Sequence, residues 1–127
     1  MITPVPVAAT LATMLLGSLV GMSQRGLELF VETTRTRRDA YSGEPKMHSI
    51  GLQRRVAEAN AEIGLAWTLA QQNCDLLEAA MEHDPPMATE ARAQVRWNAA
   101  YAAELCRRAA DRLYAGAGAN AAHNSHA

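Results

Sequence analysis

Residues 95–127 read VRWNAAYAAELCRRAADRLYAGAGANAAHNSHA, and this stretch decides the fold class. Its apolar residues recur at three- and four-residue spacing, which places them on one stripe of an α-helix: Val95, Ala99, Ala102, Leu105, Cys106, Ala109 and Leu113. Opposite charges lie four positions apart on the outer faces: Glu104 with Arg108, and Arg107 with Asp111. Gly116 and Gly118 free the backbone for positive φ and predict that the helix ends near Tyr114. The glycine-rich corner is then either a simple helix cap or a place where backbone approaches a ligand closely.

A second helical pattern precedes this one and covers residues 49–83, with Ser49 as a suitable N-cap. Its apolar stripe is unbroken: Leu52, Val56, Ala59, Ile63, Ala66, Ala70, Cys74, Leu77 and Met81. A second apolar side holds Leu65, Leu69 and Leu76. A helix of roughly 50 Å that is apolar on two sides needs partners on both, in its own bundle or in a neighbouring subunit. Asp84-Pro85-Pro86 then ends this helix and begins the next, which we expect over residues 86–115.

The first segment requires a membrane test, because residues 1–24 carry no charge and are long enough to span a bilayer. Prolines and glycines interrupt the segment at Pro4, Pro6, Gly17 and Gly21. No Lys or Arg precedes the apolar run, so the charged start of a signal peptide is missing. The apolar stripe also continues past Arg25 to Val31, with Glu28 and Glu32 on the opposite side. We therefore expect residues 6–38 to form one buried helix of a soluble protein, with a transmembrane helix as the alternative.

The amino-acid composition limits the classes of function that this chain could have. The 127 residues allow one domain, and 12 Lys and Arg oppose 13 Asp and Glu. This balance provides no strong field to recruit nucleic acid or an acidic membrane. Cys74 and Cys106 both fall inside helical patterns with apolar neighbours, so we interpret each as a small core residue rather than half of a disulfide. That interpretation fits a reducing cytoplasm.

The sequence therefore predicts an all-α fold: an up-and-down bundle of three long helices over residues 6–38, 49–83 and 86–115, followed by the glycine corner and tail of residues 116–127. No strand pattern and no internal repeat interrupt this order. Three long antiparallel helices form an incomplete four-helix bundle. We expect either a fragment or a protein that borrows its fourth helix from a partner.

The turn after the first helix is basic. Residues 34–46 read TRTRRDAYSGEPK and hold the cations Arg35, Arg37, Arg38 and Lys46. Cations near a helix C-terminus complement the helix dipole, which is one interpretation of the cluster. The other is an anion site for a phosphate or pyrophosphate, because the planar guanidinium group matches phosphate oxygens. The residues alone leave both open.

Three segments carry a resemblance to a known family: GMSQRGLELFVETTRTRRDAYSG at residues 21–43, LQRRVAEANAEIGLAWTLA at 52–70 and AAELCRRAADRLYAGAGANAAHNSHA at 102–127. Their order and their gaps resemble the C-terminal helical domain of the acyl-CoA dehydrogenase superfamily. Within it, the chain is most similar to the two-component flavin-dependent monooxygenases that hydroxylate aromatic compounds. No single motif is diagnostic, but together the segments cover nearly the whole chain.

The resemblance implies a role in binding a cofactor and in assembly. In that family the domain is a four-helix bundle that assembles dimers and tetramers and contacts flavin across the subunit interface. It implies that FMN or FAD meets the turn and the glycine corner through its phosphate side, at Arg37, Arg38, Tyr41, Gly43, Gly116 and Gly118. It also implies a homo-oligomer, and, in the two-component branch, a separate flavin reductase as a partner.

Parts of the family pattern have no counterpart in this sequence. The N-terminal helical domain and the middle β-barrel are not represented, and the closing helix with its histidine would begin after Ala127. The carboxylate base of the acyl-CoA dehydrogenases has no counterpart in the glycine corner, so we assign no catalytic residue. His123 and His126 form an H-x-x-H pair without a third ligand nearby, so we predict no metal site.

Two functions remain open at this point. The first is a piece of a flavin-dependent oxidoreductase that contributes oligomer contacts and a flavin phosphate site. The second is a non-catalytic helical module that only self-associates. For either one we expect a cytoplasmic protein with no nucleic-acid partner and no membrane partner, and the sequence does not name a substrate.

Overall fold

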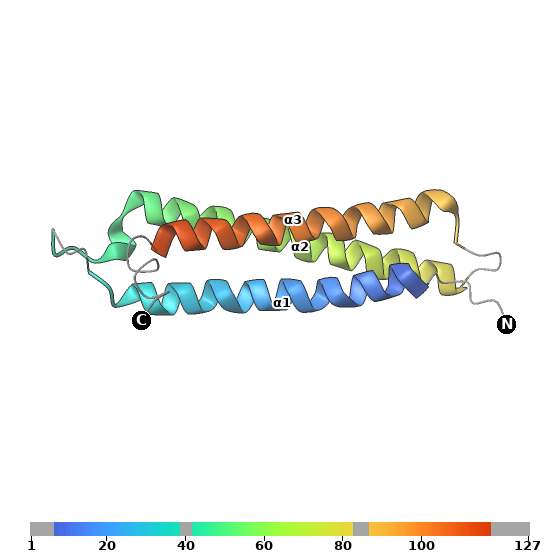
Figure 1. Cartoon of the computed structure of the whole chain (residues 1–127), viewed down its shortest axis with the longest axis horizontal. Coiled ribbons are helices and arrows are strands. Elements are labelled where there is room, and N and C mark those ends of the chain that lie inside the picture. Colours follow the sequence, from blue (N-terminus) through green and yellow to red (C-terminus); the bar gives the residue numbers. More distant parts are fainter. Residues whose placement is uncertain (1–6, 39–41, 83–86, 118–127) are drawn as a thin grey trace.

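The computed structural model describes residues 7–38, 42–82 and 87–117, and this part of the chain is almost entirely helical. Helix α1 spans Val7–Arg35, α2 spans Ile50–Glu82 and α3 spans Thr89–Ala117, with a short 3-10 helix, η1, at Lys46–His48. The three long helices lie along a common axis, and each runs opposite to the next (Figure 1). The described residues contain no strand, only one isolated bridge between Arg38 and Pro45. The prediction of an all-α bundle of three long helices is confirmed.

The helix ends follow local chemistry. Arg37 donates its backbone N–H to the carbonyl of Thr34 at 3.0 Å, a turn that ends α1 at Arg35 rather than at residue 38. Ser49 caps α2, because its Oγ accepts the backbone N–H of Leu52 at 3.4 Å. Helix α3 continues through Gly116 to Ala117, so the predicted stop near Tyr114 was wrong. The predicted turn at Asp84-Pro85-Pro86 lies outside the described residues, apart from the ends of α2 and α3 that flank it.

Small side chains from all three helices build the core. Within the described residues, the larger apolar cluster occupies the half of the bundle that ends at the basic turn: Leu16, Val20, Leu27, Ala59, Ile63, Ala66, Ala70, Ala102, Leu105, Cys106 and Ala109. A smaller one occupies the other half: Ala9, Leu77, Ala80, Met87 and Val95. Alanine is the most frequent residue in both clusters, and no aromatic residue is among them. Alanine has no side chain beyond Cβ, so it lets helix backbones approach closely.

A layer of buried polar side chains separates the two clusters. We call it the polar layer, and it consists of Thr13 from α1, Asn73 from α2 and Asn98 from α3. Asn73, with no exposed surface, donates to the Val95 carbonyl at 3.0 Å and to Thr13 Oγ1 at 3.4 Å. Asn98 donates to Asn73 Oδ1 at 3.0 Å, so the layer joins all three helices. Its hydrogen bonds offset the cost of burying amides away from water.

The polar layer corrects the predicted stripe of α2. The stripe placed Cys74 and Met81 in the core, but both are exposed. The buried positions are instead Asn73 and Ala80, one residue earlier in each case. The prediction followed apolar residues, whereas the helix buries the amide that reaches α1 and α3. Cys106 is 2% exposed, so its predicted place in the core is confirmed.

The second apolar side of α2 is partly covered by packing within the chain. Leu69 packs against the larger cluster and Leu76 against the smaller one, whereas Leu65 remains exposed. Helix α2 therefore leaves less apolar surface for an outside partner to cover than the sequence indicated.

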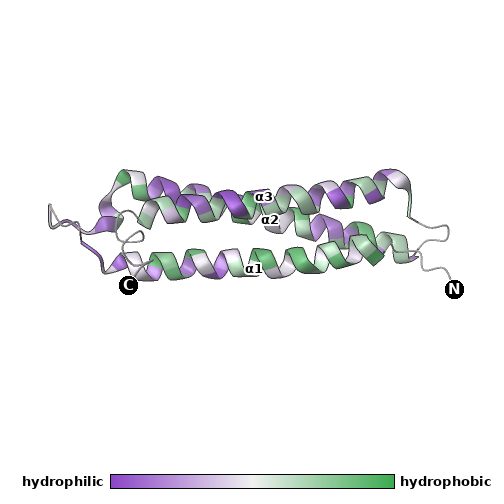
Figure 2. Cartoon of the chain, viewed as in Figure 1, coloured by the Kyte–Doolittle hydropathy of each residue, from purple (hydrophilic) through white to green (hydrophobic). Residues whose placement is uncertain are grey.

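Helix α1 is long and apolar enough to cross a membrane, and 22% of its most apolar window is buried within the bundle. One side packs on α2 and α3 through Leu16, Val20 and Leu27. The other side, which we call the α1 outer face, carries exposed Val7, Leu11, Met14, Leu15, Met22 and Leu29. Figure 2 shows the hydrophobic colouring along the N-terminal half of this helix. The expectation of a fully buried helix was therefore wrong for half of its circumference.

We predict that Asn73→Ala lowers the free energy of unfolding by about 2–4 kcal/mol, because it leaves a cavity and removes one partner of Asn98 and the donor to the Val95 carbonyl. Asn60→Ala is the matched control, since Asn60 is exposed on the same helix and should change stability by no more than about 0.5 kcal/mol. Urea unfolding followed by far-UV circular dichroism measures both. Equal effects of the two substitutions would show that the polar layer does not hold the bundle together.

Candidate functional site

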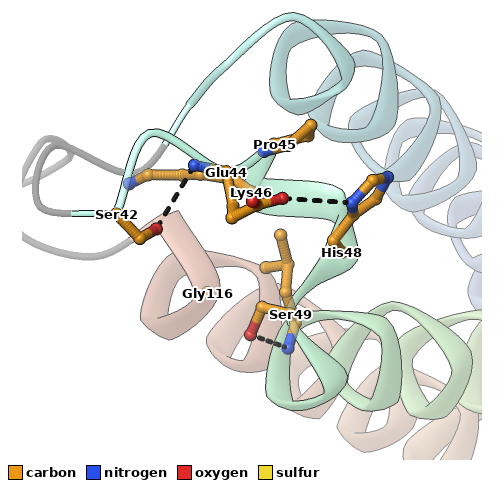
Figure 3. Close-up of a pocket in the computed structure, with 8 residues that line it drawn as sticks. Ser42, Glu44, Pro45, Lys46, His48, Ser49 and Gly116 are labelled. Atoms are coloured by element: carbon orange, nitrogen blue, oxygen red, sulfur yellow. Dashed lines mark hydrogen bonds and ion pairs between the residues drawn. The ribbon is translucent and has the colours of Figure 1, made fainter.

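The candidate site lies at the end of the bundle where α1 ends, α2 begins and α3 ends. A cavity of about 380 Å³ opens there, between the turn and the last turn of α3. Figure 3 shows Gly116 of α3 beside Ser49, with the turn residues Ser42 to His48 around them. The polar part of the lining comes from Ser42, Glu44, Lys46, His48 and Ser49. The N-terminus of α2, with its partial positive charge, is at this end.

The turn is held by its own hydrogen bonds. Gly43 has a φ of 73°, a left-handed backbone conformation that residues other than glycine rarely adopt. This places its carbonyl where the Arg38 guanidinium donates a hydrogen bond at 3.0 Å. The Lys46 N–H donates to the Arg37 carbonyl at 2.9 Å, which closes the loop. Arg38 and Gly43 therefore shape the turn, and one nitrogen of the Arg38 fork is already occupied.

Gly116 has a packing role that its sequence context did not indicate. A Cβ at this position would lie 3.1 Å from Leu52 Cδ1, 3.3 Å from Phe30 Cζ and 3.4 Å from Arg55 Cδ. These side chains come from α1 and α2, so α3 lies close to both helices at Gly116. It was predicted to stop the helix, but it lies inside the helix, where it allows close contact. The same lack of a side chain leaves backbone open to the cavity.

The structure brings the predicted site residues to one end of the bundle but not to one pocket. Gly116 lines the cavity described above. Arg37 instead lines a groove of about 410 Å³ between α1 and α3, together with Phe30 and Tyr114. Arg38 and Gly43 are exposed on the turn. Tyr41 and Gly118 lie outside the described residues.

Sequence reasoning missed part of the cavity lining. His48 was not singled out, although it follows Lys46 by two positions and η1 carries both. Glu44 Oε2 lies 3.8 Å from His48 Nδ1, so a carboxylate lines the same cavity as Lys46. Lys46 belongs to the predicted basic cluster, and its place in the cavity supports the interpretation of that cluster as an anion site.

Carboxylates near the site are paired with arginines. Glu62 is buried and accepts a hydrogen bond from Arg112 Nε at 2.5 Å. Glu58 pairs with Arg54 at 2.9 Å and also with Arg112. The hydrogen bond from Arg54 is the main cause that lowers the pKa of Glu58 below its ordinary 4.5, and the charge of Arg112 adds to it. Both carboxylates are therefore occupied in structural pairs with arginines, a poor arrangement for a general base.

Metal chemistry finds no support in the part of the chain that the structure describes. No group of three His, Cys, Asp or Glu side chains there comes together in a way that could hold a metal ion. His123 and His126, the pair for which the sequence predicted no metal site, lie outside the described residues. The described arrangement offers a polar cavity in which Lys46, Ser49 and the N-terminus of α2 could donate to an anionic group, beside the carboxylate of Glu44.

We predict that Gly116→Val lowers the free energy of unfolding by about 1–3 kcal/mol, because the new methyl groups overlap Leu52 and Phe30. Gly64→Val is the control, since a Cβ at Gly64 meets nothing within 4 Å. Thermal unfolding compares the two variants. A Gly116→Val protein as stable as the control would show that the end of α3 does not pack as described.

Glu58 gives a prediction about pH. Its pKa is lowered in the folded protein, so the unfolded chain binds the proton more readily. The stability it contributes is fully present above pH 4.5 and is lost as pH falls through the lowered pKa. Glu58→Gln should therefore flatten the fall of melting temperature between about pH 5 and pH 3. An unchanged slope in the variant would contradict the pairing with Arg54 and Arg112.

Comparison with known proteins adds one finding. A family described as acyl-CoA dehydrogenase, C-terminal domain, matches residues 14–127. No curated protein and no solved structure matches the chain.

Proposed function

Because this chain belongs to the family of acyl-CoA dehydrogenase C-terminal domains, a family of flavin-dependent oxidoreductases, we propose that it is the helical domain of such an enzyme. In this role it contributes assembly contacts and binds the phosphate side of the flavin at the turn end of the bundle. The observation that carries the proposal is the coincidence of the family match with a cavity in which Lys46 and Gly116 meet.

The residues at the turn end fit a phosphate group. Lys46 supplies positive charge, His48 supplies an imidazole, Ser49 caps α2, and Gly116 keeps the floor free of a side chain. Ammonium groups, hydroxyls and helix N-termini are the donors that phosphates bind in proteins. A bound flavin supplies electron or hydride transfer, and the residues of this chain would hold and orient its phosphate side. Arg37, a further cation of the predicted set, lines the separate groove between α1 and α3 at the same end of the bundle.

The same end does not fit the flavin ring. Ser42, Glu44 and His48 are exposed, so the cavity is open to water on the turn side. Flavin chemistry requires a pocket that excludes water around the ring. The described helices provide no such enclosure, and the buried carboxylate Glu62 is already paired with Arg112. We therefore propose that the ring and the substrate lie against other parts of an assembled enzyme.

The finer features of the proposal come from the resemblance. We propose the aromatic monooxygenase branch, with FMN or FAD as cofactor and a separate flavin reductase as a partner. We also propose a cytoplasmic protein that forms dimers or tetramers. Each of these rests on the three sequence segments quoted above and on the family to which the chain belongs.

A second candidate function is a non-catalytic module that self-associates. The α1 outer face favours it, because a row of large exposed apolar side chains in a water-soluble protein indicates an interface. The two functions are compatible in one protein, since a domain that binds cofactor between subunits also assembles them.

We predict that the chain alone binds FMN and pyrophosphate weakly, with dissociation constants of roughly 0.1–1 mM, and shows no turnover. Binding should weaken as salt rises, because an exposed phosphate contact is screened. Lys46→Gln and Arg37→Gln should each weaken it about three- to tenfold. Arg96→Gln, which removes an exposed cation near the far end of α3, is the matched control. Isothermal titration at two salt concentrations measures these effects.

Equal binding by all the variants would remove the phosphate site from the turn end. Tight, salt-insensitive FMN binding with catalysed hydroxylation would contradict the claim that the ring lies elsewhere.

A further inference from the structure

The last two turns of α3 have few apolar contacts with the rest of the bundle. Among the described residues of this helix, Ala109 is the last that is buried, and beyond it Leu113 is only partly buried against the larger cluster. Gly116 belongs to this weakly packed segment, yet it lines the cavity and lies close to Leu52 of α2. The shape of the cavity therefore depends on a further interaction that holds the end of α3 in place.

An ion-pair network between α2 and α3 supplies that interaction. We call it the Arg112 network, and it joins Arg54, Glu58 and Glu62 of α2 to Arg112 of α3. Arg112 Nε donates to Glu62 Oε1 at 2.5 Å, and Arg112 Nη1 donates to Glu58 Oε2. Arg54 Nε donates to the other oxygen of Glu58 at 2.9 Å. The two carboxylates are four positions apart, so one guanidinium group spans a full turn of α2 and resists sliding of α3.

The partial burial of this network makes it more than a surface ion pair. The side chain of Glu62 is 11% exposed, and those of Glu58 and Arg112 are 34% and 37% exposed. Ion pairs in full contact with water contribute little, whereas a buried carboxylate that loses its partner is costly. Arg107 offers the contrast, because both of its carboxylate partners lie on α3 itself and link no second helix.

The Arg112 network adjoins the cavity without lining it. Arg112 lies four positions before Gly116, so the two residues share a face of α3 and are about 6 Å apart along the helix axis. The cavity lining includes Gly116 together with Ser49 and Leu52 from the first turn of α2, and no member of the network belongs to it. Figure 3 shows Gly116 and Ser49 beside each other at this edge. The network is thus placed to set how the end of α3 meets the start of α2.

We propose that Arg112 is a positioning residue for the anion site: its pairing with Glu58 and Glu62 holds Gly116 at the edge of the cavity, and the affinity for a phosphate-bearing anion depends on that pairing. The inference rests on the proposed function and adds what holds the site in shape. The donors, Lys46 and the N-terminus of α2, lie on other elements than α3. A mobile end of α3 must be ordered when the anion binds, and that ordering reduces affinity.

A direct electrostatic effect is the competing explanation. Arg112 is a cation at the same end of the bundle, so its charge alone would attract an anion. The two explanations predict opposite signs when the carboxylates are neutralised. Removing the negative charges of Glu58 and Glu62 makes the end of the bundle more positive, which favours an anion. The same change releases the end of α3, which disfavours it if positioning decides the affinity.

The experiment measures pyrophosphate binding by isothermal titration at low salt, at a temperature where every variant is folded by far-UV circular dichroism. The double variant Glu58→Gln/Glu62→Gln should bind about three- to tenfold more weakly than the wild type. Arg112→Lys should also weaken binding, because it keeps the charge but lacks the planar fork that reaches both carboxylates. Glu28→Gln/Glu32→Gln is the matched control, since it removes two exposed carboxylates four positions apart on α1 and should not weaken binding.

The outcomes separate the explanations. Tighter binding by the Glu58→Gln/Glu62→Gln variant would overturn positioning in favour of the electrostatic effect. A lower melting temperature with an unchanged dissociation constant would reduce the network to a role in stability and overturn the inference as well. If the double variant does not fold, Arg112→Lys decides, and wild-type affinity in that variant would overturn positioning.

A failure of the proposed function gives a different result. A wild-type chain that binds no pyrophosphate would overturn both the phosphate site and the positioning role. Binding that Lys46→Gln weakens, but that neither Arg112→Lys nor the double carboxylate variant weakens, would leave the phosphate site standing and overturn the positioning role alone.

Discussion

The hydrogen bonds of Asn73 are the constraint on which the rest of the bundle depends. Alanine-rich helices can shift along each other at a small cost in free energy, because each methyl group finds a similar methyl contact after the shift. A buried amide cannot slide, since it must keep its partners on the neighbouring helices. Asn73 donates to Thr13 of α1 and to the Val95 carbonyl of α3, and Asn98 donates back to it. The polar layer therefore sets the register in which the apolar clusters on both sides of it pack.

That register determines what happens at the turn end. Because the helices are fixed lengthwise, the last turn of α3 lies beside Leu52 and Phe30, where a Cβ at Gly116 would crowd both side chains. Gly116 and the cationic turn then share one end of the bundle, although more than 60 residues separate them in the chain. The candidate phosphate site thus follows from helix length and register rather than from any local motif.

Much of this could be predicted from the sequence, and the exceptions have physical causes. The spacing of the apolar residues was enough to predict the three helices. The cap at Ser49 could be predicted as well, because capping depends only on neighbouring residues in the chain. The sequence could not show that Asn73 rather than Cys74 is buried, because this depends on which groups of the neighbouring helices the Asn73 amide can reach. Gly116 was misread for the same reason, since its context resembles a helix stop until Leu52 and Phe30 are placed beside it. The predicted phosphate contacts at Arg37 and Arg38 remain predictions, and the structure gives Arg38 a partner within the turn.

The alanine-rich core has an optical consequence. Trp67 and Trp97 are 51% and 70% exposed, and Tyr101 and Tyr114 are exposed as well, so these chromophores have no rigid apolar environment. Their near-ultraviolet dichroism will be weak, and their emission will resemble that of indole in water, even when every helix is packed. In most proteins those two signals together indicate a molten globule. In this protein they are what the native state should show, so tertiary order must be judged from methyl resonances or amide exchange instead.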